Sequence, residues 1–207
     1  MQRVQSGFEN QFAILNYLAE EWAQQVASWE SPSDRSTPNP EIEIMGNSLQ
    51  QRGVDAWLLL DANEEIWQVG SSSELSPEVG TADQVLATLM TQNETLVFEE
   101  GLQRKHGLLI VGQTPWLISI AAIPDGQNSG LAGSKLVLGQ VFDEADIQSL
   151  AEQVKFPIRV GLYRDDASDP DFQQARSFFQ SNNENIYLER FSDTNLAGYV
   201  LLNDIRQ

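Results

Sequence analysis

Residues 8–30 read FENQFAILNYLAEEWAQQVASWE, and this stretch decides how the chain begins to fold. Its large apolar residues recur with an average spacing of about 3.5 residues, which is the period of a coiled-coil seam. The seam consists of Phe8, Phe12, Leu15, Leu18, Trp22, Val26 and Trp29. The serines and prolines of SPSDRSTPNP then end the pattern. The spacing predicts a helix over residues 8–30, and its seam packs either against a second helix or against the chain's own core.

The sequence that follows alternates between helix and strand patterns. The expected helices cover residues 40–53, 81–91, 143–154 and 169–181. Strands are expected on either side of the turn DANEE at residues 61–65, and over residues 106–113, 115–123, 134–142, 156–164, 184–191 and 196–204. A helix followed by a mainly antiparallel sheet with inserted helices is an α+β fold. We expect one domain over residues 1–207, with a core sheet region at 54–142 and C-terminal helices and closing strands at 143–207.

Composition excludes several classes of partner and site. The chain has 207 residues, 41% apolar content and a formal net charge of −18 with 12 basic side chains. Such a surface repels nucleic acid and anionic lipid. The absence of cysteine excludes disulfides, thiolate metal sites and cysteine nucleophiles.

Neither a membrane span nor a leader is expected within the chain. Residues 107–124 carry no charge, but a central GQTP divides them into two short strand-like runs. The first residues, MQRVQSG, lack the apolar core of a signal peptide.

Catalytic and metal-binding patterns are weak throughout. His106 is the single histidine, which excludes a cage of histidines, and no G-x-S-x-G elbow accompanies it, so we interpret it as a capping or surface residue. The turn at Asp61 lacks the glycine and the final glutamate of a calcium loop. GLAGSK at residues 130–135 has neither the order nor the spacing of a phosphate loop. We therefore predict no catalytic residue, no metal and no cofactor.

Aromatic and cationic residues on the expected strands are candidates for a small-molecule pocket. Trp67 and Trp116 lie on strand patterns, and an apolar wall with a few polar groups is typical of such sites. Arg159 and Tyr163 are four residues apart, which places both on one face of the expected strand. Some of these four residues are predicted to line a cavity, and core packing is the alternative for the tryptophans.

Four stretches in order carry a resemblance to a known family: LAEEWAQQVASWE, GVDAWLLLDANEEIWQVG, GLLIVGQTPWLISIAAI and GSKLVLGQVFDEADIQSLAEQV. They resemble the type-four CHASE domains, which are extracellular sensory domains of bacterial cyclases and histidine kinases. The terminal stretch Leu196–Gln207 is similar to the closing strand of that family. The matching positions are Trp22, Trp29, Asp55, Asp61, Gly107, Pro115, Ala121, Ile123, Pro124, Gly133, Leu136 and Gly139.

The resemblance implies a PAS/Cache-like fold, with a five-stranded antiparallel sheet and the long helix behind it. It also implies an extracytoplasmic sensory domain of a bacterial inner-membrane protein that recognises an unknown small molecule and signals through its N-terminal helix. The helix seam would then form a homodimer contact, and flanking segments would provide the membrane anchor. The output would be a histidine kinase or a nucleotide cyclase such as a diguanylate cyclase. Two other functions stay open: a stand-alone soluble small-molecule-binding protein and a carboxylate-dependent hydrolase.

Overall fold

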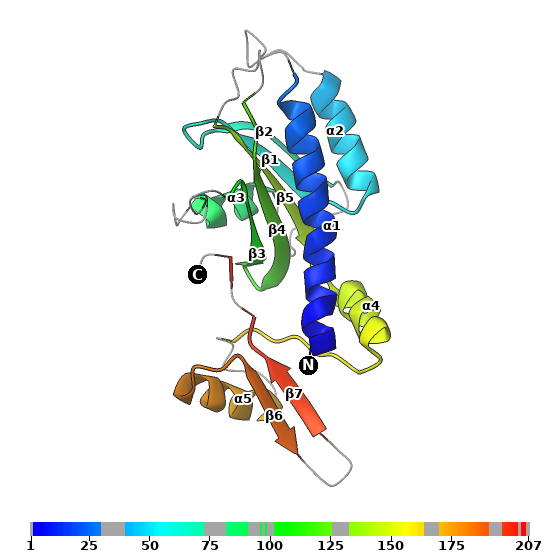
Figure 1. Cartoon of the computed structure of the whole chain (residues 1–207), viewed down its shortest axis with the longest axis vertical. Helices are drawn as coiled ribbons and strands as arrows, with labels where there is room; N and C mark the ends of the chain where they lie inside the picture. Colours follow the sequence, from blue (N-terminus) through cyan, green and yellow to red (C-terminus); the bar gives the residue numbers. More distant parts are fainter. Residues whose placement is uncertain are drawn as a thin grey trace. The chain divides into compact units, whose positions relative to one another are not determined.

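Figure 1 shows the computed structural model, which describes residues 2–29, 40–72, 82–90, 96, 98, 102–125, 133–163, 170–190, 196–202 and 204–205. The elements are α1 (Gln2–Val26), α2 (Pro40–Gln51), β1 (Ala56–Leu60), β2 (Ile66–Ser71), α3 (Ala82–Met90), β3 (Arg104–Val111), β4 (Thr114–Ala122), β5 (Lys135–Val141), α4 (Glu144–Val154), α5 (Pro170–Ser181), β6 (Ile186–Arg190) and β7 (Leu196–Val200).

The chain divides into two compact units. The small unit comprises Met1–Glu9 and Asp143–Asn203, and the sheet unit comprises Asn10–Phe142 and Asp204–Gln207. Helix α1 therefore contributes its first residues to the small unit and the rest to the sheet unit. The expectation of one sensory domain over residues 1–207 stays a prediction.

The sheet unit is built on an antiparallel sheet of five strands in the order β2-β1-β5-β4-β3. Strand β1 reads AWLLL, and all five of its residues are buried because both faces of the sheet are covered. The expected α+β architecture with a five-stranded antiparallel sheet and a long N-terminal helix is confirmed. The additional C-terminal helices and strands are present as well.

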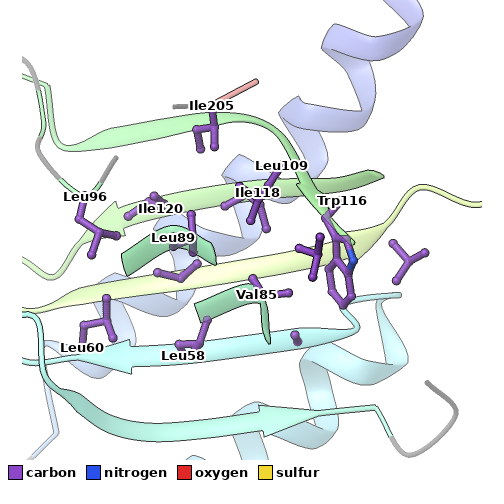
Figure 2. Close-up of a cluster of buried hydrophobic side chains, with 14 residues drawn as sticks. Leu58, Leu60, Val85, Leu89, Leu96, Leu109, Trp116, Ile118, Ile120 and Ile205 are labelled. Carbon is purple, nitrogen blue, oxygen red and sulfur yellow. The ribbon is translucent and has the colours of Figure 1, made fainter. Parts of the chain in front are cut away.

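One face of this sheet carries the main hydrophobic core (Figure 2). Leu58 and Leu60 of β1 and Trp116 of β4 are fully buried there. Helix α3 lies over them with Val85 and Leu89, which are also fully buried. Alternation along the strands turns their remaining residues to the opposite face.

Helices α1 and α2 cover that opposite face. Ser119, which lies between two core residues of β4, donates a hydrogen bond from Oγ to Asn16 Oδ1 of α1 over 2.7 Å. Trp57 of β1 contacts α2 at Gly46. The two helices are also linked to one another, because Arg52 after α2 pairs with Glu21 of α1 at 2.9 Å.

Two aspartates shape the ends of β1. Asp61 Oδ1 accepts hydrogen bonds from the backbone N–H groups of Asn63 and Glu65 at 2.9 and 3.0 Å. Asp55 Oδ2 accepts one from Val141 N–H of β5 at 2.8 Å. The interpretation of DANEE as a hairpin turn is confirmed, and both aspartates have structural roles.

The small unit contains α4, α5 and the two-stranded antiparallel sheet β6–β7. Helix α4 begins with a capping box in which the Asp143 carboxylate accepts from Ala145 and Asp146 N–H at 2.8 and 3.0 Å. A Cβ on Gly7 would lie 2.2 Å from Leu150 Cδ1, so this glycine allows α1 to approach α4 closely.

An aromatic stack, formed by Phe178 of α5, Tyr187 of β6 and Tyr199 of β7, joins the remaining elements of the small unit. The ring centroids of Phe178 and Tyr187 are 4.6 Å apart, and those of Tyr187 and Tyr199 are 5.6 Å apart. Helix α5 is thereby attached to one face of the small sheet.

Most predicted elements agree with the structure, but one strand was wrong. Residues 156–164 were expected to form a strand, and the described part, residues 156–163, has no regular structure. Pro157 lacks an N–H for a strand ladder. The carbonyl of Leu162 instead accepts a hydrogen bond from Arg176 Nη2 of α5 at 3.0 Å. Asp169, the first residue of the helix expected over residues 169–181, lies outside the described residues.

Helix α1 also differs from its predicted bounds. It begins at Gln2 rather than at residue 8 and ends at Val26, before two turn hydrogen bonds lead to Trp29. Among the described residues, none of the helices combines the length and the apolar character that crossing a membrane requires.

Candidate functional site

A cleft of about 470 Å³ lies in the sheet unit between α2 and the β1–β2 hairpin. This volume is within the usual range for small-molecule sites. From α2 the lining residues are Pro40, Ile42, Glu43, Gly46, Asn47 and Gln50. From the hairpin side they are Val54, Trp57, Gln68, Val69, Gly70, Ser71 and Ser72. Since β2 is an outer strand of the sheet, the cleft follows a sheet edge.

Two glycines position the indole of Trp57 in this cleft. Trp57 is directly opposite Gly70 in the β1–β2 register, and a Cβ on Gly70 would lie 2.3–2.5 Å from the indole atoms. A Cβ on Gly46 of α2 would lie 3.3–3.6 Å from the same atoms. The indole therefore packs directly on the β2 backbone, and the small residue on α2 lets that helix come close to the sheet edge.

The polar lining of the cleft is mainly uncharged. It consists of the carboxamides of Asn47, Gln50 and Gln68 together with serine hydroxyls. Glu43 is the charged residue of the lining, and it is exposed. The cleft can therefore donate and accept hydrogen bonds without a strong local charge.

A second polar arrangement attaches α1 to the sheet. Phe12, Asn16 and Glu20 recur every four residues on one side of α1. The first two contact His106 of β3, and Glu20 contacts Arg104, two residues earlier on the same strand. The rings of Phe12 and His106 have centroids 5.1 Å apart, and Glu20 pairs with Arg104. We call these residues, together with Asn16 and Ser119, the α1 anchor.

The hydrogen bonds of the anchor determine the state of His106. Asn16 Nδ2 donates to His106 Nδ1 at 3.0 Å, while Asn16 Oδ1 accepts from Ser119. An accepting Nδ1 requires neutral imidazole with its proton on Nε2. Partial burial lowers the pKa of His106, and the positive charge of Arg104 lowers it further.

The seam of α1 is covered by the chain itself. Leu15, Leu18 and Val26 are at most 4% exposed. Phe8, Trp22 and Trp29 are also buried, and Phe12 is half-buried in the anchor. This burial agrees with the alternative of core packing, and a homodimer contact through the seam stays a prediction.

The four predicted pocket residues belong to different surroundings. Trp116 is fully buried in the core, and Trp67 is half-buried on β2 beside the cleft-lining residues. Arg159 lies over the ring of Phe172 with 5.9 Å to the centroid, and Tyr163 is 39% exposed. None of the four lines the cleft. Arg159 and Tyr163 also do not share a strand face, because their segment is not a strand. Ligand binding by these residues stays a prediction.

Sequence reasoning missed both the cleft and the anchor. The four-residue spacing of Phe12, Asn16 and Glu20 beside the seam was a signal for the anchor. The strand residues that these side chains contact are up to 103 positions away in the sequence, so the spacing could not identify them. In the part of the chain that the structure describes, no group of three or more acidic or histidine side chains is placed to hold a metal ion.

The crystal structure of the Vibrio cholerae LuxQ periplasmic domain is similar with a TM-score of 0.48 and 10% sequence identity, over 98% of this chain and 96% of that one. No curated protein sequence matches the chain.

Comparison with protein families found the CHASE4 domain, which matches residues 8–160. This range contains the α1 anchor, the cleft and all five strands of the larger sheet. It ends before Leu196–Gln207, so the expected likeness of that stretch to the family's closing strand falls outside the match. Since the match covers most of the sequence, the chain belongs to the CHASE4 domain family.

Proposed function

We propose that the chain is the ligand-sensing, extracytoplasmic domain of a membrane-bound bacterial signalling protein. The observation that carries this proposal is the CHASE4 match over residues 8–160, a family of sensory domains. The domain binds a signal molecule, and catalysis belongs to an output module elsewhere in the parent protein, a histidine kinase or a nucleotide cyclase.

The cleft and the α1 anchor suggest how a signal leaves the domain. Helix α2 forms one wall of the cleft, and Arg52 at its end pairs with Glu21 of α1. A ligand that binds more tightly to one position of α2 favours that position, and the Arg52–Glu21 ion pair then favours the matching position of α1. The ligand can shift α1 only by its differential affinity for the two arrangements, which for allosteric coupling is typically about 1–3 kcal/mol.

We also propose that two copies pair through the outer face of α1. Since the seam is buried, the contact uses Ile14 and Tyr17, which are 62% and 64% exposed and lie about one turn apart. Sedimentation analysis should give a dimer for the unchanged protein and a monomer for Tyr17→Glu. A monomer at millimolar concentration of the unchanged protein would contradict this pairing.

The gene context provides the first test of the sensory role. An apolar stretch of about 20 residues on each side of the chain is expected in the parent protein. A kinase or cyclase module should follow the second stretch. A parent without any signalling module would contradict the proposal.

The absence of cysteine allows a direct test of transmission in that parent. Glu21→Cys combined with Arg52→Cys would tie α1 to the end of α2 through a disulfide or a short bismaleimide. We expect the output to become insensitive to the stimulus and to regain sensitivity after reduction of the disulfide. Each single-cysteine variant is the matched control, because it removes the same ion pair without forming the link. An unchanged response in the cross-linked protein would exclude signalling through α1 and α2.

A further inference from the structure

We propose that the cleft between α2 and the β1–β2 hairpin takes a small, uncharged molecule rich in hydroxyl groups, such as a sugar or a polyol. This inference rests on the proposed sensory function, because that function requires a ligand site, and it adds the chemical class of the ligand.

The charges around the cleft disfavour ionic ligands. Among the described residues that line it there is no lysine or arginine, so an anion would lose its hydration without gaining a cationic partner. The net charge of −18 adds to this penalty. A cation would find Glu43, but an exposed carboxylate contributes little to an ion pair in water.

The hydrogen-bonding groups of the cleft match hydroxyl groups. Each carboxamide of Asn47, Gln50 and Gln68 offers both a donor and an acceptor, as the Ser71 hydroxyl does. A hydroxyl group has the same dual character, so one such ligand can satisfy several of these side chains at once. A purely apolar ligand would remove them from water without replacing their hydrogen bonds.

The apolar part of the lining completes the match. Trp57 and Val54 belong to the sheet side of the cleft, and Ile42 belongs to α2. These three side chains are at most 9% exposed, and Val69 of β2, which is 41% exposed, adds apolar surface that can meet the C–H face of a sugar ring while the polar side chains bind its hydroxyls. This combination of an apolar wall with a few placed polar groups is typical of sites that select one small molecule.

Isothermal titration calorimetry on the whole chain tests the class of ligand. The uncharged probes are D-glucose, D-galactose, sucrose and myo-inositol, and the charged probes of matched size are D-glucuronate and protonated D-glucosamine. We expect at least one uncharged probe to bind about tenfold or more tightly than either charged probe. Equal or tighter binding of a charged probe, or no binding of any uncharged probe, would overturn the inference.

Variants then test the position of the site. Asn47→Leu with Gln68→Leu should weaken binding of the uncharged probe by about tenfold or more. Gln24→Leu on the exposed side of α1 is the control and should leave it unchanged. Gln50→Arg, at an exposed position that tolerates a charge, should shift the preference towards D-glucuronate. Unchanged affinities in all cleft variants would overturn the assignment.

This outcome is separable from the sensory role. If transmission in the cross-linked parent behaves as proposed while no uncharged probe binds, the ligand class is wrong and the sensory function stands. If uncharged probes bind but cross-linking leaves the response unchanged, the signalling route is wrong and the ligand class stands.

Discussion

The two units of this chain are stabilised in different ways. In the sheet unit, five strands are covered on both faces, and Leu58, Leu60 and Trp116 are fully buried. In the small unit, the sheet has two strands, and Leu188 and Leu196 are 55% and 67% exposed. A two-stranded sheet is marginal without further packing, and here α5 supplies that packing on one face through stacked aromatic rings.

The proposed ligand site lies in one of the two units. The cleft, the α1 anchor and the main core all belong to the sheet unit, which the family match includes almost entirely. Helix α5 and strands β6 and β7 lie beyond residue 160, where the match ends. We therefore expect the sheet unit to carry most of the free energy of unfolding and the small unit to open more readily.

Trp116→Ala should have the largest effect, because it removes a fully buried indole from the main core. We expect the free energy of unfolding of the sheet unit to fall by about 3–5 kcal/mol. Urea denaturation followed by near-ultraviolet circular dichroism measures this free energy of unfolding. Trp67→Ala is the matched control. Because Trp67 is half-buried on β2, its removal should lower the free energy of unfolding by less. Equal losses at the two positions would contradict the proposed location of the core.

Gly70→Ala should come next, because its Cβ would lie 2.3–2.5 Å from the Trp57 indole. Overpacking of this kind costs about 1–3 kcal/mol in the free energy of unfolding. The thermal midpoint should therefore fall. A second change, Trp57→Leu, provides the control, since a smaller side chain should recover part of the loss. Failure of this rescue would show that the glycine is needed for a reason other than the indole.

Tyr187→Leu should have a smaller effect that stays local to the small unit. It removes two stacked contacts, to Phe178 and Tyr199, each contributing about 0.5–1.5 kcal/mol. Amide hydrogen exchange should show loss of protection in α5, β6 and β7, with β1 and β5 unchanged. If protection falls equally in the sheet unit, the two units are one cooperative structure and the comparison between them fails.

His106→Gln should have the smallest effect, visible as a change in pH dependence. The pKa of His106 is lowered in the folded chain, so folding favours neutral imidazole. The resulting stability is fully present above the unfolded pKa of about 6.5 and is lost as pH falls through the folded pKa. The unfolding free energy of the unchanged protein minus that of the variant should therefore decrease as pH falls below about 6.5.

The groups that face His106 define the controls for this titration. Asn16 and the ring of Phe12 on α1 contact the imidazole, and Asn16 also accepts a hydrogen bond from Ser119 of β4. Arg104 on β3, which pairs with Glu20, is the nearby charge that lowers the pKa of His106. Glu20→Gln removes the partner of Arg104 and should change the pH at which His106 loses its contribution, without abolishing it. If the difference in unfolding free energy between the unchanged protein and His106→Gln is constant between pH 5 and pH 8, the hydrogen bonds proposed for the α1 anchor are contradicted.

Much of the local structure was predictable because it depends on short-range patterns. The seam of α1, the turn at Asp61 and the strand runs of β1, β3, β4 and β5 all follow from the spacing of apolar and turn residues. The strand predicted at residues 156–164 failed because an apolar alternation does not provide a partner strand. The pocket prediction relied on residue type alone. Residue type does not distinguish a pocket tryptophan from a core tryptophan, and Trp116 is fully buried in the core.

The sequence by itself determined the helix periods, the turns, the acidic character and the family resemblance, because each of these depends on neighbouring residues or on composition. The tertiary structure alone decided what the α1 seam contacts, which uncharged side chains line the cleft, and how Asn16 meets His106 across 90 positions. These features depend on which strands pair and which faces they present. Such long-range pairings are selected by the packing of the whole sheet unit, so no local pattern can specify them.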